Sequence, residues 1–121
     1  MPTRIPSQFA VRVDRFTAAA VVRVLGEVDL ATVAMLDRAI GDAFALEPQR
    51  LVVDLTRCGF LGAVGLTSLV RATRRGTRSG TSVMVAVDST GSAHRAIVLT
   101  GLAEHLALIG YSPEDCVLIP T

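Results

Sequence analysis

The sequence contains no lysine and no tryptophan, and its 12 basic residues are all arginine. Without a lysine amine, the chain lacks the group needed for Schiff-base chemistry, for a Walker-type phosphate loop and for a lysine general base. Aromatic residues make up only 4% of the chain, and the formal net charge is +1. Because stacking platforms and an overall positive field are both weak, we expect no direct binding of nucleic acid.

Long apolar runs are also missing. No stretch approaches the roughly 18 apolar residues that cross a bilayer, and the start at Met1 leads into no uncharged signal-peptide core. The sequence therefore predicts a cytoplasmic protein without membrane insertion.

Cysteine and histidine are scarce, at two residues each. Cys58 and Cys116 lie too far apart for a short-spaced zinc pair, and two cysteines are too few for a disulfide scaffold. His94 and His105 have no nucleophile that the sequence ties to them. Since Gly-x-Ser-x-Gly, Walker and paired-carboxylate patterns are absent as well, we predict no metal, no cofactor and no enzymatic activity.

What the chain does have is apolar periodicity, with half of its 121 residues hydrophobic. Short β-branched runs and helically spaced apolar residues predict five strands and three helices. The expected strands cover residues 9–13, 19–25, 51–55, 82–87 and 106–109. The expected helices follow residue 29, begin near residue 62 and cover residues 92–99, and a final turn is expected at Pro113.

Strands that alternate with helices indicate a single α/β domain over residues 1–121, with a mixed, mostly parallel β-sheet. Its first two strands should form an antiparallel hairpin. Asp29 is expected to cap the first helix, and a turn is expected around Arg57–Gly59. Asp54 lies in an otherwise apolar strand, so we expect hydrogen bonds to hold its carboxylate.

Three stretches of the sequence match one known pattern: Leu25–Asp29 (LGEVD), Leu51–Leu66 (LVVDLTRCGFLGAVGL) and Leu99–Leu102 (LTGL). Together they resemble the STAS family, which includes anti-sigma-factor antagonists. The middle stretch is the most specific, because the family pattern is an apolar strand, Asp-Leu-Ser/Thr, then Phe-Ile/Leu-Asp-Ser-Ser/Ala-Gly-Leu at a helix start. The resemblance covers about the whole chain and implies a single STAS-like domain.

The two residues that carry regulation in this family are replaced here. Gly62 stands where the family has Asp, and Ala63 stands where it has the serine that a kinase-type anti-sigma factor phosphorylates. Ala63 has no hydroxyl, so it cannot gain the charge of about −1.5 to −2 that a phosphoryl group adds. The resemblance therefore implies a non-enzymatic antagonist that binds a protein kinase-like anti-sigma factor without phosphorylation control at Ala63.

The partner-binding surface is expected to include the helix start, formed by Gly62, Ala63, Val64 and Gly65. The resemblance also places Asp29 near that surface. This part of the chain would then recognise the anti-sigma factor through uncharged backbone and small apolar side chains.

Four arginines follow on the same helix. Arg71, Arg74, Arg75 and Arg78 recur at i, i+3, i+4 and i+7, so they share one helix face. The face is either simply solvated or in contact with an acidic protein partner, and contact with nucleic acid is a third, minor alternative. We include Arg71 and Arg74 in the expected contact.

The two cysteines suggest a second means of regulation. Cys58 occupies a core position of the family pattern, which favours burial as a small apolar side chain. A reversible disulfide between Cys58 and Cys116 would supply the signal that Ala63 cannot carry, provided that the fold brings the two residues together.

Other functions stay open at this stage. The free N–H groups of a helix that starts near Gly62 could hold an anion, which would suit a small-ligand or nucleotide-binding sensor. STAS domains also occur as subunits of membrane transporter complexes. A homodimer is a further contact that the sequence leaves open.

Overall fold

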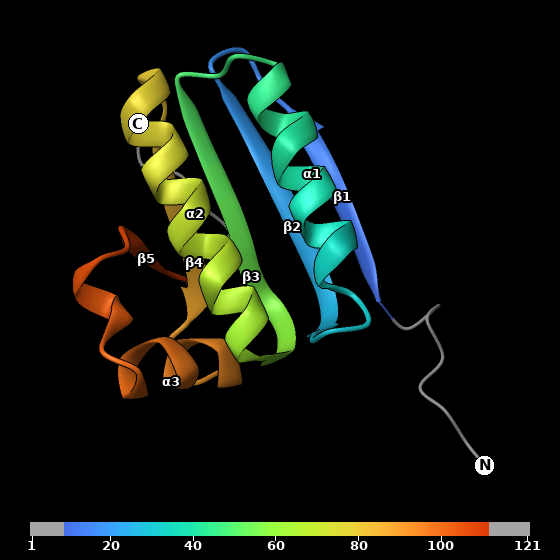
Figure 1. Ribbon diagram of the computed structural model, residues 1–121, viewed down its shortest axis with the longest axis vertical. Coiled ribbons are helices and arrows are strands. Elements are labelled where there is room, and N and C mark those ends of the chain that lie inside the picture. Colours follow the sequence, from blue (N-terminus) through green and yellow to red (C-terminus); the bar gives the residue numbers. More distant parts are fainter. Residues whose placement is uncertain (1–8, 112–121) are drawn as a thin grey trace.

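The computed structural model describes residues 9–111 of the chain. Within this range, five strands form one sheet in the order β1-β2-β3-β4-β5, and three α-helices pack on it (Figure 1). β1 runs antiparallel to β2, and the other neighbouring strands are parallel. The predicted α/β fold with an antiparallel N-terminal hairpin is confirmed. The elements are β1 (Ala10–Arg15), β2 (Ala19–Val28), α1 (Val33–Ala45), β3 (Arg50–Leu61), α2 (Ala63–Ser79), β4 (Ser82–Asp88), α3 (Ser92–Leu99), the 3-10 helix η2 (Leu102–Glu104) and β5 (Leu108–Tyr111).

The helices are placed unevenly around the sheet. α1 and α2 lie side by side on one face, α1 over β1 and β2 and α2 over β3 and β4, while α3 lies at the end where β3 and β4 finish (Figure 1). No helix within residues 9–111 is long and apolar enough to cross a membrane. The opposite face of the sheet has no described helix over it, so polar side chains can gather there.

The main core fills the space between the sheet and the helices. Alternate residues of each strand point into it, as the two-residue period of a strand requires. Its buried members include Val22, Val24, Leu36, Ile40, Leu51, Val53, Leu55, Leu66, Leu69, Val85 and Ile97. A smaller cluster of Val21, Val52 and Ala86 lies on the other face, which explains why the first part of β3 is apolar on both sides.

The turn predicted around Arg57–Gly59 is wrong, because β3 continues to Leu61. β2 also runs on to Val28, and the parallel ladder pairs Gly26 with Cys58 and Val28 with Leu61. The register of this pairing shifts twice, between Arg23 and Leu25 and between Gly26 and Glu27. At each shift the strand bulges, and the pairing then continues although the regular alternation of inward and outward side chains is interrupted. The sequence pattern breaks where the strands bulge, and this break resembles a turn.

The expected helix cap at Asp29 is also wrong. α1 begins at Val33, and Thr32 is the N-cap residue. The Asp29 carboxylate instead accepts a hydrogen bond from the Ala31 N–H at 2.9 Å, while the Thr32 hydroxyl donates to the Glu27 carbonyl at 2.7 Å. These bonds build a turn between β2 and α1, and this turn delays the helix by three residues.

The second helix starts close to the predicted place. Gly62 is the N-cap residue of α2, and Gly80 ends the helix in a left-handed conformation with φ 81°. The last strand begins two residues later than expected, at Leu108, because η2 precedes it. The turn expected at Pro113 lies outside the described residues.

Close packing of α2 against the start of β4 depends on Gly76. A Cβ there would lie 2.5 Å from the Thr81 carbonyl oxygen and 2.5 Å from a methyl group of Val83. We expect Gly76→Ala to lower the free energy of unfolding by about 1–3 kcal/mol, because the added methyl overpacks this contact. Gly41→Ala on α1 is the control, since no atom lies within 4 Å of its Cβ position.

Urea denaturation of both variants measures the difference. Gly41→Ala should keep the wild-type stability or gain up to about 1 kcal/mol from helix propensity. Equal stabilities of the two variants would contradict the close approach of α2 to β4.

Candidate functional site

The start of α2 lies at the carboxyl end of β3, where it is fastened to the end of β2. The Gly62 N–H donates a hydrogen bond to the Val28 carbonyl at 2.9 Å, and the Gly62 carbonyl accepts bonds from the N–H groups of Gly65 and Leu66 at 3.0 and 3.1 Å. The Phe60 ring lies over this point, 3.3 Å from the place where a Gly62 Cβ would stand. The first turn of α2 is therefore held in a fixed position.

The predicted helix-start residues differ in exposure. Ala63 is exposed, Gly62 and Val64 are half-buried, and Gly65 is buried. A Cβ on Gly65 would lie 2.6 Å from a methyl group of Leu61, so this glycine lets α2 pack closely on the end of the sheet. Ala63 and Val64 are therefore accessible from solvent, whereas Gly65 lies against the end of the sheet.

Two large apolar side chains beside this helix start are exposed, and sequence reasoning missed both. Phe60 precedes Gly62 by two residues and is 48% exposed, and Leu30 follows Val28 by two residues and is 82% exposed. A strand or helix pattern assigns such residues to the core, so their exposure appears only in the structure. We call Leu30, Phe60, Ala63 and Val64 the apolar tip.

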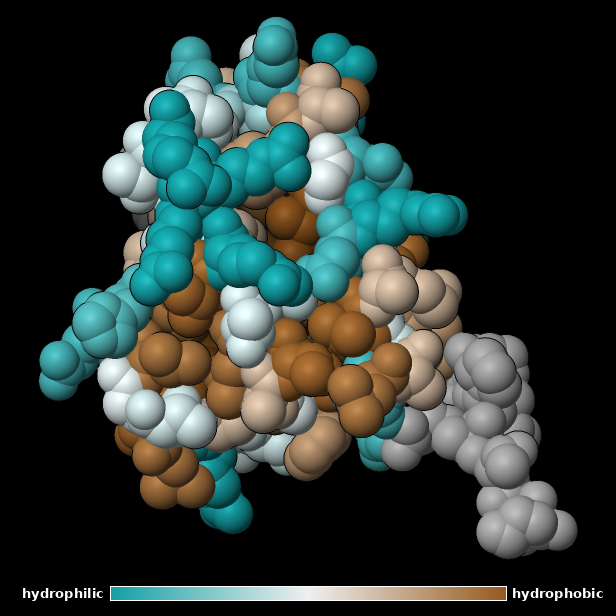
Figure 2. Space-filling view, in the orientation of Figure 1, coloured by the Kyte–Doolittle hydropathy of each residue, from teal (hydrophilic) through white to brown (hydrophobic). Residues whose placement is uncertain are grey.

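Ala63 and Val64 of the apolar tip begin the helix that carries four arginines further along. Arg71, Arg74, Arg75 and Arg78 line a groove between α1 and α2 together with Asp37. Figure 2 shows hydrophilic side chains gathered across the upper part of this face and hydrophobic ones below them. Arg71 and Arg74 lie on one face of α2 together with Arg75 and Arg78, as the helical spacing predicts.

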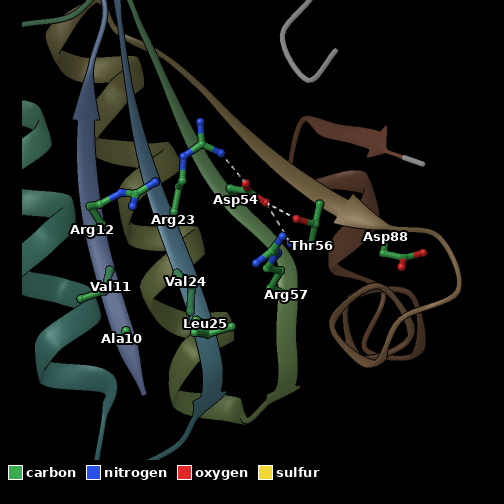
Figure 3. Close-up of a pocket in the computed structure, with 10 residues that line it drawn as sticks. All are labelled: Ala10, Val11, Arg12, Arg23, Val24, Leu25, Asp54, Thr56, Arg57 and Asp88. Carbon is green, nitrogen blue, oxygen red and sulfur yellow. Dashed lines mark hydrogen bonds and ion pairs between the residues drawn. The ribbon is translucent and has the colours of Figure 1, made fainter. Parts of the chain in front are cut away.

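The helix start is less suited to an anion than the sequence suggests. The Gly62 N–H is already bonded to Val28, and the Phe60 ring occupies the space above it. A groove of about 610 Å³ lies elsewhere, along β1, β2 and β3 on the sheet face opposite α1 and α2 (Figure 3). Its lining includes Arg57 and Asp88, so a small ligand would find polar groups there rather than at Gly62.

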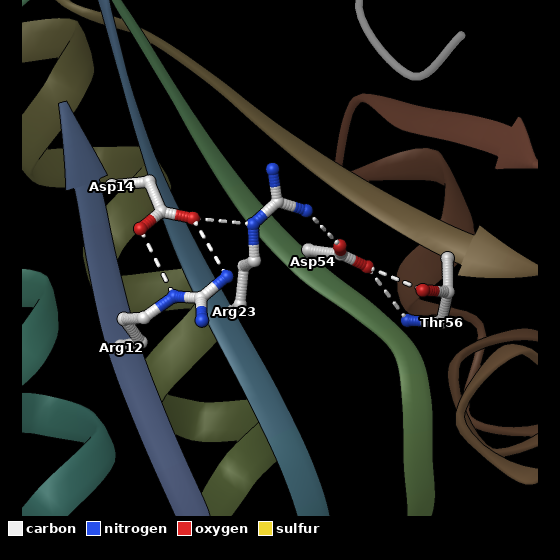
Figure 4. Close-up of polar contacts among 5 residues, drawn as sticks. All are labelled: Arg12, Asp14, Arg23, Asp54 and Thr56. Atoms are coloured by element: carbon white, nitrogen blue, oxygen red, sulfur yellow. Dashed lines mark hydrogen bonds and ion pairs between the residues drawn. The ribbon is translucent and has the colours of Figure 1, made fainter. Parts of the chain in front are cut away.

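Part of this groove is a polar network across three strands (Figure 4). Asp54, only 6% exposed, accepts hydrogen bonds from Arg23 at 3.0 Å and from the N–H and hydroxyl of Thr56 at 2.9 and 2.6 Å. Arg23 also donates to Asp14 at 2.6 Å, which lowers the pKa of the Asp14 carboxyl, and Arg12 pairs with Asp14 at 3.0 Å. The expectation that hydrogen bonds hold Asp54 is confirmed.

Cys58 lies beneath the helix start and is buried. Its thiol contacts the Phe60 carbonyl at 3.1 Å, and burial raises the pKa of the Cys58 thiol. This burial opposes thiolate formation, on which disulfide exchange depends. Cys116 lies outside the described residues, so the redox pair stays a hypothesis.

Comparisons with known proteins agree on one family. The protein-family model described as "Mlab, STAS domain" matches residues 11–110 of the chain. The chain is 40% identical over 98 residues to the anti-sigma-F factor antagonist RsfB of Mycobacterium tuberculosis, covering 80% of this chain and 78% of that relative. It resembles the crystal structure of an anti-sigma factor antagonist from Mycobacterium paratuberculosis, with a TM-score of 0.79 and 32% identity over 93% of this chain and 94% of that one. The structure of unphosphorylated SpoIIAA shares the fold, with a TM-score of 0.71 and 17% identity over 88% of this chain and 91% of that one.

The network predicts unequal effects for two aspartates. Asp54→Asn should lower the free energy of unfolding by about 1.5–3 kcal/mol, because a buried carboxylate loses its charge-assisted bond to Arg23. Asp37→Asn is the matched control, since its contact with Arg71 at 3.4 Å is exposed and worth about 0–1 kcal/mol. Thermal and urea unfolding measure both, and equal losses would show that the Asp54 network is not structural.

The buried thiol predicts slow chemistry at Cys58. In a Cys116→Ser variant, iodoacetamide at about pH 8 should label Cys58 far more slowly in buffer than in denaturing urea, because burial keeps the thiol protonated and covered. Mass spectrometry of the labelled chain over time gives the two rates. Equal rates would mean that the thiol is accessible, which would favour the redox hypothesis.

Proposed function

The chain belongs to the STAS domain family, and we propose that it is a non-enzymatic regulatory protein that binds a protein kinase-like anti-sigma factor. The observation that carries this proposal is the exposed, uncharged start of α2, with Ala63 at its surface. The curated relative at 40% identity is named an anti-sigma-F factor antagonist, and the structural relative at 32% identity is an anti-sigma factor antagonist. Both names support the same class of partner.

The proposed contact is built around the apolar tip. Phe60 and Leu30 expose large apolar surfaces, and burying such surface in a complex stabilises it by about 25 cal/mol per Å². Asp29 lies in the connection that carries Leu30, where it can add a polar contact at the edge. Uncharged residues at the centre with polar residues around them are the usual arrangement of a protein interface.

Phosphorylation would not release this contact at the position that the family uses. A phosphoryl group at the centre of an apolar contact would bring a charge that the partner must desolvate. Ala63 offers no oxygen for that modification, and Gly62 removes the acidic neighbour of the family pattern. We therefore propose that binding is controlled by another signal, or by the amount of protein.

A small-ligand sensor is the second candidate function. The groove of about 610 Å³ on the open sheet face favours it, because Arg57 is exposed there and Asp88 also lines the groove. Arg23 and Asp54 are already bonded to each other, so a ligand would have to bind around an existing network. This makes the sensor the weaker of the two proposals.

A charge at the apolar tip tests the proposed contact. We expect Ala63→Glu to weaken binding to the anti-sigma factor of the same genome at least about tenfold, which equals about 1.4 kcal/mol. The reason is that a carboxylate on the exposed first turn of α2 would be buried without a partner. Isothermal titration calorimetry measures the affinity, and circular dichroism verifies that the fold is retained.

Thr17→Glu is the matched control, because Thr17 is exposed in the β1–β2 hairpin at the far end of the sheet. It should bind like the wild type, and adding ATP with magnesium should leave the wild-type affinity unchanged. Sedimentation of the chain without the anti-sigma factor measures whether it forms a homodimer, so that self-association is not mistaken for the contact with the anti-sigma factor. Equal affinities of the Ala63 and Thr17 variants would show that the helix start is not the contact.

A further inference from the structure

The arginine face of α2 forms one wall of a groove of about 500 Å³ against α1. We call this space, lined by Asp37, Arg71, Arg74, Arg75 and Arg78, the arginine groove. Figure 2 shows a hollow between hydrophilic side chains on this face, with hydrophobic atoms at its base. The base includes Ile40 and Ala72, which are both buried. The groove therefore combines a positive rim with an apolar floor.

The charges of the arginine groove are unbalanced. Of the residues from 9 to 111, Asp37 is the one acidic residue that lines it, against four arginines. Arg71 lies 3.4 Å from Asp37, and both side chains are exposed, so water screens this pair and leaves its bond easy to exchange. Within residues 9–111, neither Arg74 nor Arg78 forms an ion pair with an acidic side chain.

Structural roles within the chain explain only two of the four arginines. Arg78 lies in the last turn of α2, where a positive charge complements the helix dipole. The Arg75 guanidinium lies 4.4 Å from the centre of the Phe44 ring, a cation–π contact that fixes it at the groove. Arg71 and Arg74 lie further from the helix end, so neither role explains them.

We propose that the arginine groove binds an acidic segment of the protein partner. Guanidinium groups hold carboxylates through paired hydrogen bonds, and the aliphatic parts of Asp or Glu side chains would lie over Ile40 and Ala72. Gly41 contributes no side chain to the groove, and no atom lies within 4 Å of its Cβ position, so there is room for a chain to lie between the helices.

Two observations favour an acidic peptide over a nucleic acid. Among the described residues, no aromatic side chain lines the groove, and the Phe44 ring is buried against Arg75, so the groove offers no stacking platform for a base. Ser68, which also lines the groove, lies one helical turn beyond Val64 of the apolar tip, so one partner could cover both. The identity of that partner rests on the function proposed above, whereas the chemistry of the groove does not.

A peptide titration tests the groove without the partner. A hexaglutamate peptide, added to the full chain at low salt, should shift the backbone amide signals of residue 41 and residues 71–78 in a saturable way. Gly41→Glu should weaken this binding at least about tenfold, because its own carboxylate would occupy the arginines. Gly41→Gln is the matched control, since it fills the same space without the charge, and it should bind at least about tenfold more tightly than Gly41→Glu.

Three results of this titration would overturn the proposal. One is the absence of saturable shifts at these residues, and another is equal binding by Gly41→Glu and Gly41→Gln. The third is tighter binding of a single-stranded DNA hexamer than of hexaglutamate at the same salt, which would make the groove a nucleic-acid site. Loss of peptide binding as salt is raised is the expected behaviour of an exposed charged contact.

Binding to the anti-sigma factor then separates the two proposals. If the groove takes part, Gly41→Glu should weaken that complex about tenfold relative to Gly41→Gln. If Ala63→Glu weakens the complex and the two Gly41 variants bind equally, the groove proposal fails and the proposed function stands. If the wild type does not bind at all, the proposed function fails, and the peptide titration alone decides whether the groove is an acidic-peptide site.

Discussion

The structure depends above all on the parallel pairing of β2 with β3. This ladder runs from Ala19 and Arg50 to Val28 and Leu61, and it crosses two register shifts on the way. Because both strands end together, the Val28 carbonyl lies within 2.9 Å of the Gly62 N–H and fixes the start of α2. The exposed residues of the two connections are thereby brought to one end of the sheet. A shorter ladder would leave the helix start without this anchor.

The same pairing separates two kinds of chemistry. On the helix side, alternate strand residues are apolar and build the main core, while on the other side Arg23 of β2 lies opposite Asp54 of β3. If either Arg23 or Asp54 were removed, the charge of the other would stay in a site where water could hydrate it only in part. The network therefore gives the polar residues in the middle of the sheet a structural role. It also occupies the Arg23 and Asp54 side chains, which a ligand on the open face would otherwise bind.

The sequence alone was sufficient to predict the order of strands and helices, the burial of the first part of β3 and the common face of the α2 arginines, since all three follow from periodicity. It failed where local rules compete with tertiary contacts. Asp29 has the chemistry of a helix cap but completes a turn before Thr32, and Arg57–Gly59 looks like a turn but pairs with β2. The groove itself could not be predicted, because α1 contributes Asp37 and Gly41 from a distant part of the chain.

α2 thus presents two different surfaces in sequence, an apolar first turn and a charged second half. Apolar burial supplies affinity to a protein contact, whereas exposed charges mainly set the rate of association and the choice of partner. In the family pattern, one serine on the first turn places a removable charge on the affinity-giving part. With Ala63 there, such a charge cannot be added, and the arginine half becomes the part of α2 whose contribution still responds to ions and to acidic competitors. Under the proposed function, control of this chain would therefore act on partner choice more readily than on the strength of the apolar contact.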